Sequence, residues 1–183
     1  MTIYLIRHGK TVANEKHLYC GSTDLPLSDA GKEELRSVHY DIKNVCFITS
    51  DMKRTNETLH ILFGDVPYEV DPRFREVDFG IFEMHSYEEL KDTPEYQNWL
   101  TGDNDANIPP QGESGVQMKE RVLNPFSEIK EDTCIITHGG VIAAIMEYLF
   151  PGEGKNRYEW QPKPGHGYCI VKNSDADSYT LIR

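Results

Sequence analysis

The chain has 183 residues, with 19 Lys and Arg against 30 Asp and Glu, so its formal net charge is −11 when the histidines are neutral. A surface this acidic repels phosphate backbones and anionic lipid headgroups, which argues against nucleic acid and membrane surfaces as partners. At this length we expect a single domain, residues 1–183, whose core buries about two-thirds of the unfolded chain's surface without disulfides or a structural metal.

Composition and termini favour a folded cytoplasmic protein. The apolar fraction is 38% and the charged fraction 27%, which fits a globular chain and carries no sign of disorder. No apolar stretch approaches the roughly 20 residues that span a bilayer, and the N-terminus lacks the pattern of a signal peptide. The cysteines are widely spaced with no C-x-x-C pair, so free thiols are expected rather than disulfides or zinc. They are Cys20, Cys46, Cys134 and Cys169.

Strand and helix patterns alternate through the first part of the chain. Thr2 to Arg7 is apolar on both faces, which is typical of a central parallel strand covered by helices on both sides. Ser28 can N-cap the second predicted helix and Ser50 the third, which ends at Gly64. The predicted elements are a strand at 2–7, a helical segment at 10–18, a helix at 28–40, a strand at 45–49, a helix at 50–64 and a short edge strand at 66–70.

The pattern weakens between residues 73 and 112, where a loop rich in Asp, Asn and Pro follows two short helical pieces. We expect an insertion around 81–112 that covers a substrate. Strands separated by helices indicate an α/β fold, a three-layer α/β/α sandwich with a mostly parallel central sheet. The remaining predicted elements are helical pieces at 87–91 and 95–100, a helix at 113–131 interrupted by Pro125, a strand at 133–137, a helix at 141–150, and a hairpin at 168–172 and 178–182.

Histidine and arginine side chains follow the predicted strands at one edge of this sheet. In open α/β sheets, reactive groups are expected in the loops at the carboxyl ends of the strands. Two histidines, several arginines and a carboxylate meet there, in a chain whose net charge is −11. They are Arg7 and His8 after the first strand, Arg54 after the second, Arg73, Arg75 and Glu76 after the third, and His138 after the fourth.

This set of side chains suits phosphoryl transfer. A neutral imidazole nitrogen is a nucleophile toward phosphorus, and attack through a phosphohistidine divides ester hydrolysis into two easier steps. Guanidinium groups and a second imidazole can hold the charge that stays spread over the phosphoryl oxygens. The departing alkoxide needs a proton from a carboxylic acid. The residues that can fill these places are His8, Arg7, Arg54, His138 and Glu76.

Five ordered blocks of sequence extend over most of the chain. The first two are L-I-R-H-G-K-T-x-x-N at 5–14 and G-S-T-D-L-P-L-S-x-x-G at 21–31. S-D-M-K-R-T-N-E-T, F-R-E-V-D-F-G-I-F-E and I-I-T-H-G-G-V-I follow in that order. Together the blocks resemble the histidine phosphatase superfamily. The resemblance implies a phosphoglycerate-mutase-like fold and an enzyme that hydrolyses a small phosphomonoester with no metal or other cofactor.

The resemblance also implies roles for individual residues. His8 is similar to the phosphorylated nucleophile, and Glu76 to the general acid that later activates water. Arg7, Arg54 and His138 match the side chains that hold the phosphoryl oxygens. The substrate-binding residues that it implies are Asn14, Cys20, Gly21, Ser22 and Gly139.

Within the family, the segments F-G-I-F-E-M-H-S-Y-E-E-L, Y-Q-N-W-L and P-P-Q-G-E-S look most like the α-ribazole phosphatases of cobalamin nucleotide-loop assembly. Phe82 stands where a tryptophan is common, and Met84 where broad-specificity members have glycine. The alternatives are a phosphoglycerate mutase, a broad-specificity sugar-phosphate phosphatase and a non-catalytic binding module on the same fold. The sequence does not decide the oligomeric state between a monomer and a homodimer.

Several residues have competing interpretations. Glu69, Asp78 and Glu83 compete with Glu76 for the role of the acid. His166 can line the pocket or serve as a turn residue, and Glu113 can contact substrate or cap a helix. No cysteine lies six residues before an arginine, which excludes a cysteine phosphatase. P-loop, dinucleotide-binding and H-E-x-x-H motifs are absent, so nothing indicates a nucleotide-cofactor or zinc enzyme.

Overall fold

A six-stranded sheet carries the fold of the computed structural model, which describes residues 1–183. The strand order is β3-β2-β4-β1-β5-β6, and β5 alone runs in the direction opposite to the other five strands. The predicted mostly parallel sheet is therefore confirmed. The strands are β1 (Thr2–Arg7), β2 (Cys46–Thr49), β3 (Glu69–Val70), β4 (Thr133–Thr137), β5 (Gly167–Val171) and β6 (Ser178–Ile182).

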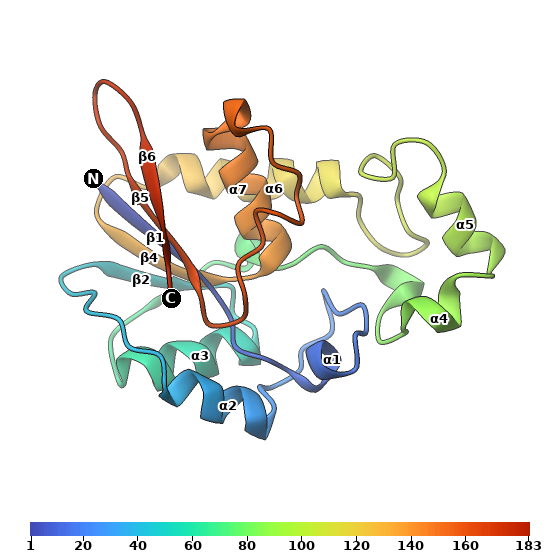
Figure 1. The fold of residues 1–183 in the computed structure, drawn as a ribbon, viewed down its shortest axis with the longest axis horizontal. Helices are drawn as coiled ribbons and strands as arrows, with labels where there is room; N and C mark the ends of the chain where they lie inside the picture. Colours follow the sequence, from blue (N-terminus) through green and yellow to red (C-terminus); the bar gives the residue numbers. More distant parts are fainter.

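Two pairs of helices cover the two faces of the sheet (Figure 1). α2 (Asp29–Arg36) packs beside α3 (Lys53–Phe63) on one face. α6 (Gly115–Glu128) packs beside α7 (Gly139–Leu149) on the other, and the 3₁₀ helix η3 (Pro151–Glu153) follows α7. This is the expected three-layer α/β/α sandwich.

The central strand β4 explains why both faces need a helical layer. All of its residues are buried, and successive side chains of a strand point to opposite faces. Ile135 joins a core of 16 buried residues formed with α6 and α7, whereas Cys134 and Ile136 join a core of six that includes Leu59 of α3. A strand covered on both faces appears in the sequence as a continuous apolar run.

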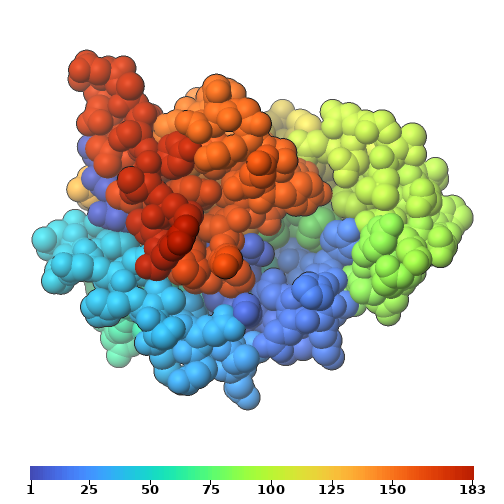
Figure 2. All heavy atoms as spheres, viewed as in Figure 1, coloured from blue at the N-terminus to red at the C-terminus, as the bar shows by residue number.

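The chain between β3 and α6 leaves the sheet and forms a lobe at one end of the molecule (Figures 1 and 2). We call residues 77–113 the lobe. Its small buried core consists of Phe82, Leu90 and Tyr96. A main-chain bridge between Leu18 and Ser86 joins it to the segment after the short helix α1 (Val12–Glu15). The short helices of the lobe are η2 (Gly80–Phe82), α4 (Tyr87–Leu90) and α5 (Pro94–Leu100), and η1 (Pro72–Phe74) precedes it.

Some predicted boundaries differ from the structure. α6 runs through Pro125 without restarting, because the proline removes a single hydrogen bond within one turn of the helix end. β3 has only two residues, since Pro67 has no N–H to donate to a strand ladder. The helical segment after β1 shrinks to the four residues of α1, and the backbone turns left-handed soon afterwards at His17, where φ is 54°.

Candidate active site

The ends of β1 and β4 place two histidines side by side. Arg7, the last residue of β1, pairs with Thr137, the last residue of β4. His8 and His138 follow directly, and the backbone N–H of His8 donates to the Thr137 carbonyl at 2.9 Å. The two imidazole rings meet edge to face with their centroids 5.1 Å apart.

Hydrogen bonding leaves one nitrogen of His8 free. Its Nδ1 lies 2.7 Å from the carbonyl oxygen of Gly9. Because a carbonyl can only accept, Nδ1 carries the proton and Nε2 keeps its lone pair. Burial, followed by the charges of Arg54 and Arg7, lowers the pKa of His8 well below its ordinary value of 6.5. The ring is therefore a neutral imidazole with Nε2 available as a nucleophile.

His138 has the opposite tautomer. The Nε of Arg54 donates to its Nδ1 at 3.3 Å, so the ring proton sits on Nε2, which lies 2.8 Å from the hydroxyl of Ser50. Burial, with Arg54 next, lowers the pKa of His138 well below 6.5. The prediction that Ser50 caps the following helix is wrong: Met52 is the N-cap of α3, and the Ser50 hydroxyl is used by the histidine instead.

Backbone carbonyls of the loop at residues 21–23 bind the guanidinium of Arg54. Its side chain is only 1% exposed. Nη1 donates to the carbonyl of Thr23 at 2.8 Å and Nη2 to that of Gly21 at 2.7 Å. An arginine has five N–H bonds, and these two contacts with the one to His138 use three of them. One N–H on each Nη is left for a ligand, which suits two oxygens of a phosphoryl group.

Arg7 lies at the carboxyl end of β1 with a hydrogen-bond donor to spare. Its Nη1 donates to the Pro162 carbonyl at 2.9 Å, but its buried Nε has no partner. Burial lowers the pKa of Arg7, and the nearby carboxylate of Glu76 opposes that shift. A buried donor without a partner costs free energy, so an anion bound here would relieve that cost.

Glu76 is a carboxylate that lines the cleft together with Arg7 and interacts with its charge. Its Oε1 accepts from the Val77 N–H at 3.0 Å, and its Oε2 accepts from the Gly140 N–H in the first turn of α7 at 2.8 Å. A side chain at Gly140 would place its Cβ 2.4 Å from Oε1, so glycine is what allows the carboxylate to approach the helix end. Helix N-termini favour negative charge.

The other acid candidates are engaged elsewhere. Asp78 accepts from the hydroxyl of Ser22 at 2.8 Å, and Glu83 binds the backbone of the 21–23 loop. Glu69 belongs to β3 at the edge of the sheet. Glu113 forms an ion pair with Arg121. Of these acidic residues Glu76 and Glu113 line the cleft, and Glu113 is paired with Arg121, which leaves Glu76 as the candidate acid.

A cleft of about 320 Å³ opens over this group between the sheet edge and the lobe. Arg7, Glu76 and Gly140 line its polar end. His8, Arg54 and His138 lie beneath that surface, 6%, 1% and 0% exposed. The opposite wall is aromatic, and sequence reasoning assigned no such role to it. Its aromatic side chains are Tyr19, Phe79, Tyr96, Trp99 and Tyr158.

The predicted substrate-binding residues separate into two groups. Asn14 and Cys20 line the cleft, and the side-chain oxygen of Asn14 accepts from the N–H of Thr11, which leaves its amide group as a donor. Gly21, Ser22 and Gly139 do not line it. Gly21 holds Arg54, Ser22 bonds to the lobe, and Gly139 begins α7, where a Cβ would lie 3.1 Å from the guanidinium carbon of Arg7.

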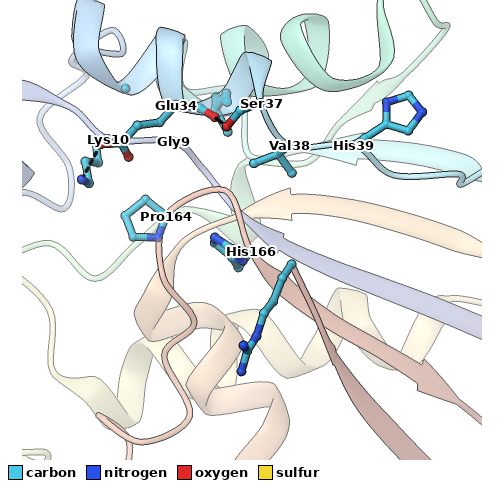
Figure 3. Close-up of a pocket in the computed structure, with 11 residues that line it drawn as sticks. Gly9, Lys10, Glu34, Ser37, Val38, His39, Pro164 and His166 are labelled. Carbon is cyan, nitrogen blue, oxygen red and sulfur yellow. Dashed lines mark hydrogen bonds and ion pairs between the residues drawn. The ribbon is translucent and has the colours of Figure 1, made fainter.

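His166 faces a different cavity. Figure 3 shows its ring close to Pro164, in a pocket of about 360 Å³ that also contains the Lys10–Glu34 ion pair. Its backbone carbonyl accepts from the N–H of Arg7 at 2.9 Å, so His166 supports the active-site strand through its main chain. No three His, Cys, Asp or Glu side chains gather closely enough to hold a metal ion. None of the helices has the length and apolar character to cross a bilayer.

Comparisons with known proteins agree with this geometry. The model of the histidine phosphatase superfamily (branch 1) matches residues 3–178. The chain belongs to this superfamily. The adenosylcobalamin/alpha-ribazole phosphatase of Salmonella typhimurium is 27% identical to this histidine phosphatase over 178 residues, which are 90% of this chain and 87% of the relative. The probable phosphoglycerate mutase GpmB of Cronobacter sakazakii is 31% identical over 163 residues, with 81% and 74% covered.

Solved structures share the whole fold of this histidine phosphatase. A structure from Escherichia coli aligns with a TM-score of 0.88 at 24% identity, covering 100% of this chain and 96% of its own. The protein TTHB049 of Thermus thermophilus aligns with a TM-score of 0.79 at 27% identity, covering 100% and 99%. The predicted phosphoglycerate-mutase-like fold and the predicted enzyme class, a histidine phosphatase, are confirmed.

Proposed function

We propose that this phosphatase hydrolyses a small phosphomonoester through a phosphohistidine at His8, and that its substrate is α-ribazole 5′-phosphate. The observation that carries the proposal is the cleft, which joins Arg7 and Glu76 at one end to an aromatic wall at the other. The cationic end suits a phosphoryl group, and the wall suits a flat apolar heterocycle stacked on aromatic rings. α-Ribazole 5′-phosphate combines the two.

The reaction that we propose has two steps. In the first, the Nε2 lone pair of His8 forms a bond to phosphorus as the ester P–O bond breaks, and the acid form of Glu76 gives its proton to the departing alkoxide. In the second, the Glu76 carboxylate takes a proton from water as that water attacks phosphorus. The P–N bond breaks, and inorganic phosphate leaves. Arg7 and Arg54 hold the phosphoryl oxygens in both steps. His138 joins them when its Nε2–H turns from the Ser50 hydroxyl to a phosphoryl oxygen.

Charge in the cleft favours this substrate over a phosphoglycerate. A phosphoglycerate carries a carboxylate in addition to its phosphoryl group, and would need a second free cation on the far wall. The cations that line the cleft are Arg7 and Arg157, and Arg157 is paired with Asp105 at 2.5 Å. Relatives named adenosylcobalamin/alpha-ribazole phosphatase lend further support. Asn14 and Cys20 are the side chains that we propose as additional contacts at the mouth.

A phosphomonoester panel tests the proposal. We expect kcat/KM for α-ribazole 5′-phosphate to exceed that for sugar phosphates and glycerol phosphates at least about tenfold, the effect of roughly 1.4 kcal/mol of extra binding. His8→Asn should lower hydrolysis of every substrate by about 10⁴-fold or more. His60→Asn, at an exposed position of α3, is the matched control. Bisphosphoglycerate-dependent isomerisation of 3-phosphoglycerate, or substantial activity in His8→Asn, would contradict the proposal.

A further inference from the structure

The carboxylate of Glu83 gathers five hydrogen-bond donors, although it lies outside the catalytic group. Its Oε1 accepts from three backbone N–H groups, those of Gly21 at 2.9 Å, Ser22 at 3.0 Å and Phe79 at 3.0 Å. Its Oε2 accepts from the N–H of Thr23 at 3.2 Å and from its hydroxyl at 2.6 Å. Charge-assisted bonds of this kind are roughly twice as strong as neutral ones. Glu83 therefore ties the 21–23 loop firmly to the lobe.

The same loop faces the catalytic group with its carbonyl oxygens. The carbonyls of Gly21 and Thr23 accept from the two Nη atoms of Arg54 at 2.7 and 2.8 Å. Gly21 also packs directly on the Val77 carbonyl, so that a Cβ there would lie 1.6 Å from that oxygen. The amides of three successive residues thus bind one carboxylate, and the carbonyls of the first and third bind one guanidinium.

We propose that Glu83 is a positioning residue, which fixes the 21–23 loop so that its carbonyls aim the guanidinium of Arg54 at the phosphoryl group. The role rests on the proposed function, because it assigns Arg54 to that group. Glu83 does not contact substrate, since both of its oxygens are occupied by the loop and by Phe79. Its place in the F-G-I-F-E segment is explained by this connection rather than by acid catalysis.

Glu83→Gln is the decisive variant. Donors converge on both carboxylate oxygens, so the amide nitrogen of glutamine would face N–H groups whichever way the amide is turned. We expect kcat/KM for p-nitrophenyl phosphate to fall by about tenfold to a hundredfold, the usual effect of misplacing a catalytic group by about 1 Å. Binding of orthovanadate, measured by calorimetry, should weaken at least about tenfold. In Glu83→Asp, which keeps the carboxylate, kcat/KM and vanadate affinity should fall less.

A double-mutant cycle separates positioning from general support of the fold. In an Arg54→Lys background, Glu83→Gln should lower kcat/KM by less than about threefold further, because residues that act as a unit are not additive. Glu88→Gln removes the same charge from an exposed side chain of the lobe and is the matched control. If Glu83→Gln does not fold, Thr23→Val is a milder variant, because it removes only one hydroxyl donor to Glu83. Vanadate binding should weaken in Thr23→Val too.

Each result decides the proposal. Unchanged vanadate affinity in Glu83→Gln, or in Thr23→Val if only that variant folds, would overturn it, as would equal losses of activity with and without Arg54. If the wild type binds vanadate but hydrolyses no phosphomonoester, the proposed hydrolysis fails while the vanadate comparison still tests Glu83. A wild type that does not bind vanadate would overturn both.

Discussion

Single hydrogen bonds give the two buried histidines different protonated nitrogens. His8 keeps its proton on Nδ1 because Gly9 offers only a carbonyl oxygen, and His138 keeps its proton on Nε2 because Arg54 donates to Nδ1. The pKa of each ring is lowered by burial, so neither needs to lose a proton before reacting. Only the first arrangement leaves a nitrogen free for attack, which supports the separate roles proposed for the two rings.

A substitution of Glu76 tests its proposed role as the general acid. Glu76→Gln should lower kcat/KM for α-ribazole 5′-phosphate by about 10²- to 10⁴-fold, the range of a general acid–base contribution. The loss should be much smaller for p-nitrophenyl phosphate, whose phenolate leaves without a proton. Steady-state kinetics on both substrates makes the comparison. Equal losses on the two esters would contradict the assignment.

The sequence could predict which candidate catalytic residues lie together, but not which residues hold them in place. Arg7, His8 and His138 follow apolar runs that fix where two strands end, and the topology of a parallel sheet then brings the ends together. Ser50 has no such signal, because a serine after a strand can equally cap a helix, and its partner His138 is 88 residues away. Thr58, which accepts from the N–H of Gly9, sits on a helix face where threonine has many possible uses.

At the scale of elements, the sheet and the lobe carry different parts of the site. The side chains that we propose to handle the phosphoryl group come from the ends of β1 and β4, from α3 and from the segment after η1. Most of the aromatic wall comes from the lobe. The short helices α4 and α5 could be predicted from the sequence, but the packing of α5 against Tyr19 could not, since it depends on contacts between segments about 80 residues apart.

Trp99 tests the contribution of the lobe to recognition. Trp99→Ala should raise KM for α-ribazole 5′-phosphate by about tenfold, since stacking on an aromatic side chain is worth about 1–3 kcal/mol per base. Turnover of glycerol phosphate, which has no ring to stack, should change little. Steady-state kinetics on the two substrates measures both effects. Parallel losses on both would indicate that Trp99 supports the fold rather than the substrate.

Across the whole molecule, an acidic exterior surrounds a cationic site. The net charge of −11 coexists with the buried Arg54 and the half-buried Arg7, which lie beside two buried histidines. Composition alone could exclude extended polyanions as partners, but it could not locate the positive charge. That location depends on the strand order, which brings together residues from distant parts of the chain.

The buried histidines make stability depend on pH. The folded-state pKa values of His8 and His138 lie well below 6.5, whereas the unfolded chain takes up protons near 6.5. Between those values the unfolded state binds more protons than the folded state. The free energy of unfolding should therefore decrease as the pH is lowered, by about 1.4 kcal/mol per pH unit for each histidine. Below the folded-state pKa values both states bind the proton, so the free energy of unfolding should stop decreasing.

Urea unfolding between about pH 7.5 and about pH 5 measures this slope. In His138→Asn the free energy of unfolding should change less steeply with pH, by the contribution of one histidine. The exposed control His60→Asn should have the slope of the wild type. An unchanged slope in His138→Asn would contradict the lowered pKa.

The carboxylate of Glu83 also sets a boundary for redesign. A lobe that only contacted substrate could be exchanged between relatives as an independent cassette. Here the lobe begins with residues that anchor Arg54 through the 21–23 loop, so a graft that includes Val77 to Glu83 would replace part of the catalytic support together with the recognition surface. Chimeras meant to alter substrate preference alone should therefore join after Glu83, which keeps the anchor native while α4 and α5 are exchanged.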